Sequence, residues 1–133
     1  MKTRLIAGFL LFLALLSGCT EDSNITPDPG RAAFLGDWTV TSSLKLTYDV
    51  TITEDPNSSN GVFIHNFACI GWSDPPASAE IQGAKIFLDA NQMIGDGLTI
   101  NGSGTLSGTR ITWSYTLFDG ADMITVTETY TKQ

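Results

Sequence analysis

From Gly36 to the end of the chain, apolar and polar residues alternate with a period of two. A period of two places successive side chains on opposite faces of a strand, whereas a helix needs a period of 3.6. In the last segment, Ile124, Val126 and Tyr130 alternate with threonines, and we expect these three side chains to face inward. The expected strands cover residues 36–46, 48–53, 62–67, 79–81, 85–88, 98–106, 111–117 and 124–131.

These strands are short and follow one another through short turns, without long crossovers. The alternation in the first strand puts Trp38, Val40, Leu44 and Leu46 on one face. One apolar and one Thr/Ser-rich face is typical of an antiparallel sheet with one buried side. Closing such a meander into a barrel removes its exposed edges. We therefore predict an all-β, eight-stranded, antiparallel up-and-down barrel.

The N-terminus has the pattern of a signal sequence. Lys2 and Arg4 precede the apolar run 5–16, which is shorter than the ~20 residues that a helix needs to span a bilayer. The run ends in Leu16-Ser17-Gly18-Cys19, which resembles the lipobox of Gram-negative bacterial lipoproteins. The resemblance implies a signal peptide at 1–18, lipidation of Cys19 and anchoring in the outer membrane. We then expect a flexible tether at 19–33 and the barrel domain at 34–133.

The chain is acidic, with a net charge of −7 and only two cysteines. The acidity argues against binding to nucleic acid and favours a soluble, monomeric domain. If Cys19 carries lipid, Cys69 has no partner for an intramolecular disulfide. We expect Cys69 to be buried, with a disulfide to another chain as the alternative.

Several strand and turn motifs carry a family resemblance. These are Gly36-Asp37-Trp38, Ile64-His-Asn-Phe67, the glycine-rich 101–108 segment and the terminal Thr-x-Thr-Tyr-Thr-Lys132. Together they resemble the small lipocalin-like lipoproteins of Gram-negative bacteria, whose calycin-type barrels open with Gly-x-Trp. The resemblance implies a fold and a location rather than an activity. Relatives often carry a Cys in the first and last strands, whereas Ser42, Ser43 and Glu128 stand in those regions here.

No set of residues predicts catalysis or a metal site. His65 is the single histidine and has no neighbouring nucleophile motif. Gly102-Ser103-Gly104 is better explained by a bend in a barrel strand than by a nucleophile. The 89–96 segment begins like a calcium loop but has Met93 and Ile94 where an oxygen ligand and a glycine belong. We therefore expect no enzyme activity, no cofactor and no metal.

The candidate ligand-binding residues are mostly large side chains on the expected inner faces. An eight-stranded barrel is either just filled by its side chains or holds one small ligand, and both alternatives stay open here. Trp72 lies in a loop rich in Asp and Pro, where it could anchor a partner or cover the core. The candidates are Trp38, Tyr48, Trp72, Trp113, Tyr115, Glu128 and Tyr130.

Glu128 is the least expected residue of this set. The alternation places it inward, beside Val126 and Tyr130, on a face without basic residues. In one interpretation it lies near an open barrel end, stays hydrated and has no role. In the other it forms a hydrogen bond with Tyr48 or Tyr115 and faces a ligand with a donor or positive charge.

The function predicted from the sequence is that of a non-enzymatic binding module on a lipid anchor. Its ligand would be a small apolar molecule or a partner protein at the barrel mouth. The alternatives are an accessory subunit of a surface complex and a hydrolase inhibitor that acts through its loops. The sequence leaves open whether the barrel faces the periplasm or the cell surface.

Overall fold

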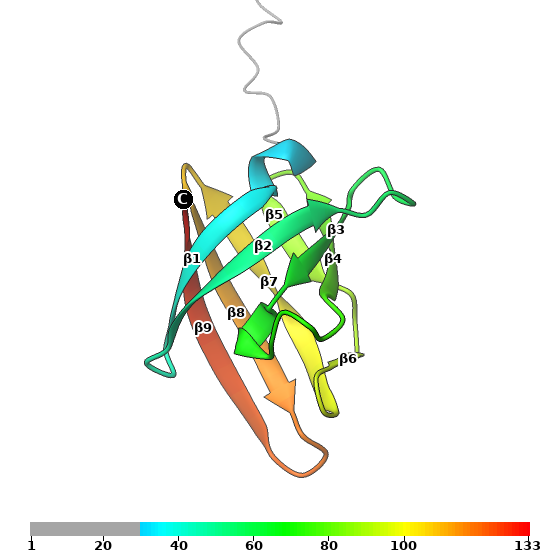
Figure 1. Ribbon diagram of the computed structural model, residues 1–133, viewed down its shortest axis with the longest axis vertical. Helices are drawn as coiled ribbons and strands as arrows, with labels where there is room; N and C mark the ends of the chain where they lie inside the picture. Colours follow the sequence, from blue (N-terminus) through cyan, green and yellow to red (C-terminus); the bar gives the residue numbers. More distant parts are fainter. Residues whose placement is uncertain (1–29) are drawn as a thin grey trace, which may run out of the picture.

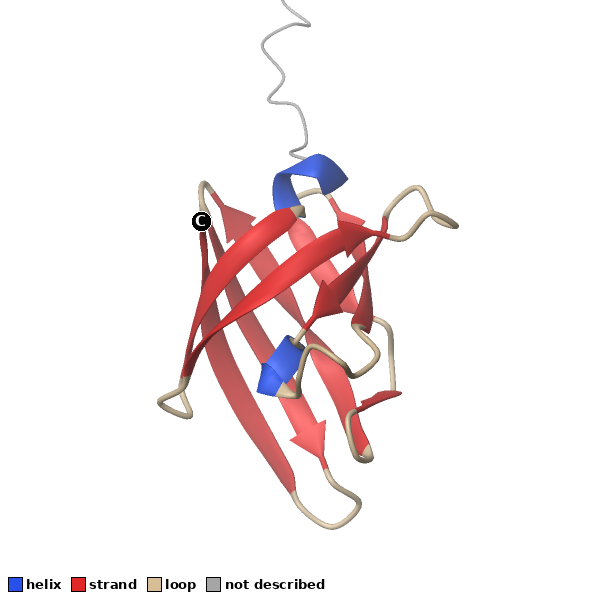
Figure 2. Cartoon of the chain, in the orientation of Figure 1, coloured by secondary structure: helices blue, strands red, loops and turns tan. Residues whose placement is uncertain are grey.

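The computed structural model describes residues 30–133, which form an all-β domain with two short 3-10 helices (Figure 2). Within this range, no helix is long and apolar enough to cross a membrane. The expected signal peptide and Cys19 lie outside the described residues. The helices are η2 (Arg31–Phe34) and η3 (Phe67–Cys69), and the strands are β1 (Gly36–Ser42), β2 (Thr47–Glu54), β3 (Gly61–His65), β4 (Ala77–Gln82), β5 (Lys85–Leu88), β6 (Gln92–Ile94), β7 (Leu98–Ser107), β8 (Arg110–Phe118) and β9 (Met123–Lys132).

The strands close into an eight-stranded antiparallel barrel, which confirms the predicted fold class. The order β5-β4-β3-β2-β1-β9-β8-β7 is closed by pairing between β5 and β7. The segment 91–97, where the sequence predicts no strand, contains the additional short strand β6, which pairs with residues 98–100 of β7. Gln92 of β6 also bonds the backbone of Ser78, accepting from its N–H at 2.8 Å and donating to its carbonyl at 2.6 Å. This side-chain amide joins β6 to the lower part of β4.

An up-and-down barrel places its connections alternately at its two ends. We call the end at η2, where the described chain begins, the proximal end (Figure 1). The connections 55–60, 83–84 and 108–109 also lie there. The opposite, distal end carries the connections 43–46, 66–76, 89–97 and 119–122, of which 119–122 lies at the bottom of the view in Figure 1. The two ends therefore display entirely different turns.

The inner faces meet in one buried cluster of apolar and aromatic side chains. Trp38 is fully buried near the proximal end, where its Nε1 donates to the Phe34 carbonyl at 3.0 Å. The Nζ atom of Lys132 lies 4.7 Å from the centre of the Trp38 ring. Arg31 of η2 bonds the 55–60 turn, donating to the Ser58 carbonyl at 2.5 Å. The end of the expected tether is thus packed on the barrel.

The outer faces of β1, β9, β8 and β7 are rich in hydroxyl groups. Thr41 pairs with Thr129, Thr129 with Thr112, and Thr112 with Thr105, so that one row of threonines crosses four strands. Threonine suits such a surface because its branched side chain packs well on a pleated, half-wet face.

Three inward predictions are wrong, because Leu44, Leu46 and Ile124 are exposed. β1 ends at Ser42, so the two leucines lie in the turn that follows rather than in the strand. Strand β1 pairs with β9 only along residues 128–132 of β9. Ile124 therefore lies on a part of the hairpin that extends past the neighbouring strand.

Two glycines on β7 are required by close approach of neighbouring groups. A Cβ atom on Gly102 would lie 2.4 Å from the Ser114 carbonyl oxygen. A Cβ atom on Gly104 would lie 2.9 Å from the ring of Trp113. The absent side chains let β8 and the indole approach β7, which agrees with the structural interpretation of this Gly-Ser-Gly segment.

Candidate functional site

A buried carboxylate with two tyrosine partners lies inside the barrel. Glu128 is only 3% exposed. Its Oε2 accepts a hydrogen bond from the Tyr48 hydroxyl at 2.6 Å, and its Oε1 accepts one from the Tyr115 hydroxyl at 2.8 Å. Among residues 30–133, no Lys or Arg forms an ion pair with Glu128. The predicted contact with Tyr48 or Tyr115 is confirmed, and both tyrosines take part in it.

The strand register explains why these side chains meet. Glu128 of β9 is paired with Ser42 of β1 on one side and with Trp113 of β8 on the other. Tyr130 follows two residues later and therefore points to the same face. Tyr115 of β8 and Tyr48 of β2 reach the carboxylate diagonally. Five polar or amphipathic side chains from β2, β8 and β9 thus share the barrel interior with Ser42.

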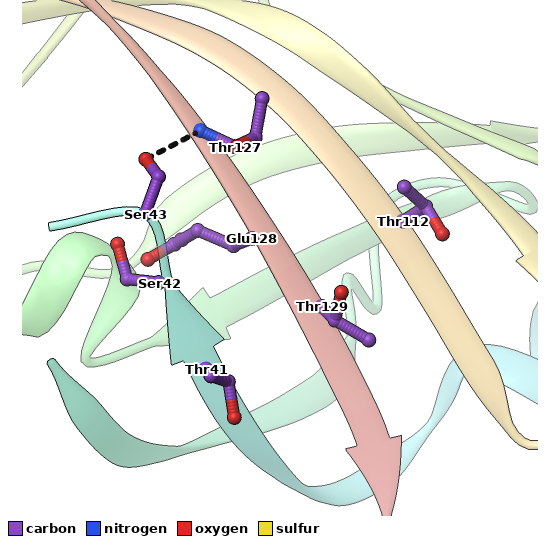
Figure 3. Close-up of a pocket in the computed structure, with 7 residues that line it drawn as sticks. All are labelled: Thr41, Ser42, Ser43, Thr112, Thr127, Glu128 and Thr129. Atoms are coloured by element: carbon purple, nitrogen blue, oxygen red, sulfur yellow. Dashed lines mark hydrogen bonds between the residues drawn. The ribbon is translucent and has the colours of Figure 1, made fainter. Parts of the chain in front are cut away.

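An open pocket of about 350 Å³ lies where β1 separates from β9 (Figure 3). Figure 3 shows the Glu128 side chain extending from β9 towards Ser42, and Ser43 Oγ accepting a 3.1 Å hydrogen bond from the Thr127 N–H. This lining offers hydroxyl groups and one carboxylate but no basic side chain. Its members are Thr41, Ser42, Ser43, Thr112, Thr127, Glu128 and Thr129.

Two buried donors on the same inner faces of β8 and β9 as Glu128 have no hydrogen-bond partner. The indole Nε1 of Trp113 and the hydroxyl of Tyr130 form no hydrogen bond with any residue that the structure describes. Both side chains are almost completely buried, at 1% and 0% exposure. A buried polar group without a partner typically costs about 1–3 kcal/mol. These two donors are therefore the least satisfied polar atoms in the described interior.

Burial changes the acidity of all three tyrosines. It is the main cause that raises the pKa of Tyr48 far above 10, with further increases from Tyr130, Tyr115 and the hydrogen bond to Glu128. Burial likewise raises the pKa of Tyr115 and of Tyr130, and the nearby charge of Glu128 adds to both shifts. The three phenols are therefore held neutral, and the hydroxyls of Tyr48 and Tyr115 remain able to donate to the carboxylate.

Phe67 closes the interior from the distal end. Its buried ring lies 4.8 Å from the Tyr115 ring and 5.7 Å from the Trp113 ring, measured between centroids. It belongs to the 66–71 segment, which Asn66 fastens by donating to the Asp49 carbonyl at 2.8 Å. We call Phe67 the plug, because it covers the aromatic side of the site.

The backbone beside the plug is strained. Asn66, Ala68 and Cys69 have φ values of 63°, 55° and 60°, although none of them is glycine. Asn tolerates this left-handed region, whereas residues such as Ala and Cys do so at a cost of roughly 1–3 kcal/mol. Strain of this kind persists only where the surrounding contacts hold the segment in place, and here Phe67 is buried and Asn66 is hydrogen-bonded to Asp49 and Gly71.

The distal end carries most of the exposed apolar side chains. Of the seven large apolar residues exposed in the described part of the chain, six lie on distal turns or on the strand ends next to them. The seventh, Phe87, lies on the outer face of β5. We call the six the distal surface: Leu44, Leu46, Trp72, Met93, Met123 and Ile124.

The described cations are concentrated at the proximal end, and the distal turns carry mainly acids. Five aspartates lie on the distal turns, where Lys45 is the single cation among the described residues. The other described cations are at the proximal end, in η2 or at the proximal ends of β5, β8 and β9: Arg31, Lys85, Arg110 and Lys132. The distal surface is thus set among acids, which are Asp74, Asp89, Asp96, Asp119 and Asp122.

The structure separates the predicted site residues into three places. Tyr48, Trp113, Tyr115, Glu128 and Tyr130 come together in the interior. Trp38 is fully buried near the proximal end, beneath η2. Trp72 is 57% exposed, so it does not cover the core. The lipidation site Cys19 lies outside the described residues.

The expected burial of Cys69 is wrong, because this cysteine is exposed. It ends η3 on the distal side, and its neighbour Phe67 takes the interior position instead. The alternative, a disulfide to another chain, stays a prediction. His65 is bonded at 2.9 Å to Thr53, and no three His, Cys, Asp or Glu side chains within 30–133 are grouped as metal ligands.

Sequence reasoning missed the plug and most of the distal surface. Phe67 was placed in the third strand, although Asn66 interrupts that strand with a left-handed backbone. An Asn within an apolar run is a usable signal for such a turn. For the distal surface, the usable signal was that its apolar residues lie beside hairpin turns. Residues at such positions have no facing strand to cover them.

No known protein-family model matches this chain, and no curated protein matches it either. The structure itself places the chain among all-β proteins, as a closed eight-stranded antiparallel barrel consistent with a calycin-like fold.

Proposed function

We propose that this protein is a non-enzymatic binding module that is lipid-anchored at Cys19 in the outer membrane and presents the distal surface to a partner protein. The anchor rests on the lipobox resemblance at 16–19. The partner-binding role rests on the structure of the distal end. Outside the distal end, Phe87 is the one other large apolar side chain that is exposed among residues 30–133.

The observation that carries the proposal is the segregation of exposed apolar side chains. Solvent-facing apolar residues are normal when scattered, but a group rimmed by polar residues marks an interaction site. Here six exposed apolar side chains share the distal end. The helix η2, at the end of the expected tether from Cys19, lies at the opposite, proximal end. An anchor at one end directs the other end away from the bilayer. Trp72 is the natural anchor residue, since Trp is enriched at interface hot spots.

The charge pattern indicates the chemistry of the partner. The distal turns carry five aspartates against Lys45. Complementary potentials steer association and exclude like-charged partners. We therefore expect a basic partner surface that also offers an apolar pocket for Trp72.

Photo-crosslinking in intact cells tests this proposal. A photoreactive amino acid replaces Trp72 at the distal end or, as the control, exposed Asn57 in a proximal turn. We expect a discrete protein adduct from position 72 and none of the same size from position 57. The adduct should become weaker when Asp89 and Asp96 are both changed to Asn. The same adducts from both ends, or an adduct unaffected by the charge change, would contradict the proposal.

A further inference from the structure

We propose that the partner at the distal end is held as an added β-strand on an unpaired edge of β9. We call this segment, residues 123–125, the free edge. In Figure 1 the hairpin of β8 and β9 extends past the turn that follows β1. Because it assumes a partner at the distal end, the inference rests on the proposed function and specifies how that partner is bound.

The hydrogen bonds of β9 show which backbone groups face the free edge. In an antiparallel sheet, successive residues of a strand direct their N–H and C=O groups to opposite neighbours. The odd-numbered residues of β9 face β1, since the Thr127 carbonyl accepts a 2.8 Å hydrogen bond from the Ser43 N–H. Beyond that bond the chain turns towards β2. Within the described chain, Met123 and Thr125 therefore have no strand on this side to pair with.

These backbone groups are a template for one further strand. Met123 and Thr125 each direct one donor and one acceptor to the free edge. Extended segments of other proteins bind to such edges through main-chain hydrogen bonds, and their alternate side chains provide specificity. Proteins that avoid this pairing place charged residues, often lysine, or proline on an edge strand. Residues 123–127 contain no charged residue and no proline.

The side chains beside the free edge indicate the apolar part of the added strand. Ile124 is on the same face of β9 as buried Val126, yet it is 46% exposed. A residue of the added strand directly opposite Ile124 would cover it, as cross-strand pairs do. Leu44 follows Ser43, whose bonds to Thr127 hold it beside β9, and it is also exposed. An apolar side chain opposite Ile124 is therefore the expected anchor of the strand.

The charges favour a strand from another protein over a second copy of this chain. Asp119 and Asp122 lie in the turn that leads into the free edge. A basic side chain on the added strand would complement them. In a second copy, residues 119–131 contain no lysine or arginine, so an edge-to-edge pair of β9 strands would lack this complement. The occupant is therefore an extended segment with basic and apolar side chains.

Proline substitution at the free edge, followed by photo-crosslinking in intact cells, tests the inference. Thr125→Pro removes an N–H of the free edge, and its ring blocks an incoming strand. The bonds from β9 to β8 use the even-numbered residues, as the bond from the Lys132 N–H to the Thr109 carbonyl shows, so they remain. Thr125→Ala removes the same side chain but keeps the N–H, which makes it the matched control.

The photoreactive residue stays at position 72, as in the test of the proposed function. We expect Thr125→Pro to reduce the yield of the protein adduct by at least about tenfold, and Thr125→Ala to retain it. Near-ultraviolet circular dichroism of the purified variants checks that both are folded. If Thr125→Pro does not fold, Met123→Pro and its control Met123→Ala give the same comparison at the other N–H of the free edge.

The results separate this inference from the proposed function. No adduct from position 72 in the chain without an edge substitution would refute the partner itself, and the added strand with it. An adduct that survives the proline variant in a folded protein would leave the partner in place but exclude an added strand. Equal loss with the alanine control would assign the effect to the side chain rather than to the backbone. An adduct of twice the mass of the chain would identify a second copy as the occupant.

Discussion

The Tyr48 hydroxyl on β2 donates a 2.6 Å hydrogen bond to Glu128 on β9, although β1 lies between these two strands in the sheet. The bond therefore crosses the inner face of β1 instead of following the ladder of neighbouring strands. With Tyr115 on β8, it joins three strands to one buried carboxylate. The interior is thus fixed by a polar cluster as well as by its apolar core.

Removing one phenol from this cluster should destabilise the barrel. We expect Tyr48→Phe to lower the free energy of unfolding by about 1–3 kcal/mol, because a buried carboxylate loses a charge-assisted donor. In a Glu128→Gln background the same change should cost less, since the two residues are coupled. Urea denaturation of the four proteins measures both values. Ser114→Ala, on the outer face, serves as a control within ~0.5 kcal/mol of the wild type, and equal costs in both backgrounds would contradict the coupling.

The three tyrosines should resist ionisation while the protein stays folded. An unfolded tyrosine has a pKa near ~10, and burial raises the pKa of all three above that value. Below about pH 10 they are neutral in both states, so this contribution to stability is complete. Above that pH the unfolded state ionises first and the free energy of unfolding falls.

Absorbance at the tyrosinate band, followed against pH, tests this expectation. Because the chain has only three tyrosines, the signal should stay flat past the ordinary pKa and then rise in one step with unfolding. Near-ultraviolet circular dichroism on the same samples reports unfolding independently. Gradual ionisation centred near ~10 in a protein with native dichroism would show that the phenols are accessible.

Trp38 should be among the most sensitive core positions. It is fully buried and its indole N–H is bonded to Phe34 of η2. We expect Trp38→Ala to cost ~3–5 kcal/mol, as large aromatic truncations do. Trp72→Ala is the matched control, because the same change at an exposed position usually stays within about 0.5 kcal/mol. Similar losses at both positions would place Trp38 outside the core.

The period of two made the barrel predictable, because it fixes which side chains share a face. It placed Glu128 beside Val126 and Tyr130 on an inner face without cations. Because no cation was available there, one interpretation of the sequence predicted a hydrogen bond between this carboxylate and a tyrosine. The sequence could not reveal where one strand extends beyond the end of its neighbour, since that depends on pairing between distant segments. Ile124 and the leucines of the 43–46 turn were misplaced for this reason.

The plug was unpredictable for a different reason. The left-handed backbone at Ala68 and Cys69 runs against the preferences of both residues, so local propensity gives the wrong answer. Burial of Phe67 against Trp113 and Tyr115 outweighs this local cost. Only the assembled barrel brings those rings together from segments far apart in the chain.

The lipid anchor is tested by metabolic labelling. We expect a fatty-acid analogue to label the wild-type protein and not Cys19→Ser, because the lipobox resemblance assigns lipid attachment to that thiol. Cys69→Ser, which removes the other cysteine, should be labelled like the wild type. Equal labelling of wild type and Cys19→Ser would show that the chain is not anchored there.

We propose that a partner occupies the distal end in the envelope, and the alkylation rate of Cys69 reports directly on that occupancy. Cys69 is exposed at that end, on the segment that leads to Trp72. Its modification by a maleimide, measured by mass spectrometry, should be at least about tenfold slower in intact envelopes than in the purified protein. A cysteine placed at the proximal end by Asn57→Cys, in a Cys69→Ser background, should react at similar rates in both. Equal rates for Cys69 in envelopes and in purified protein would show that no partner covers the distal end.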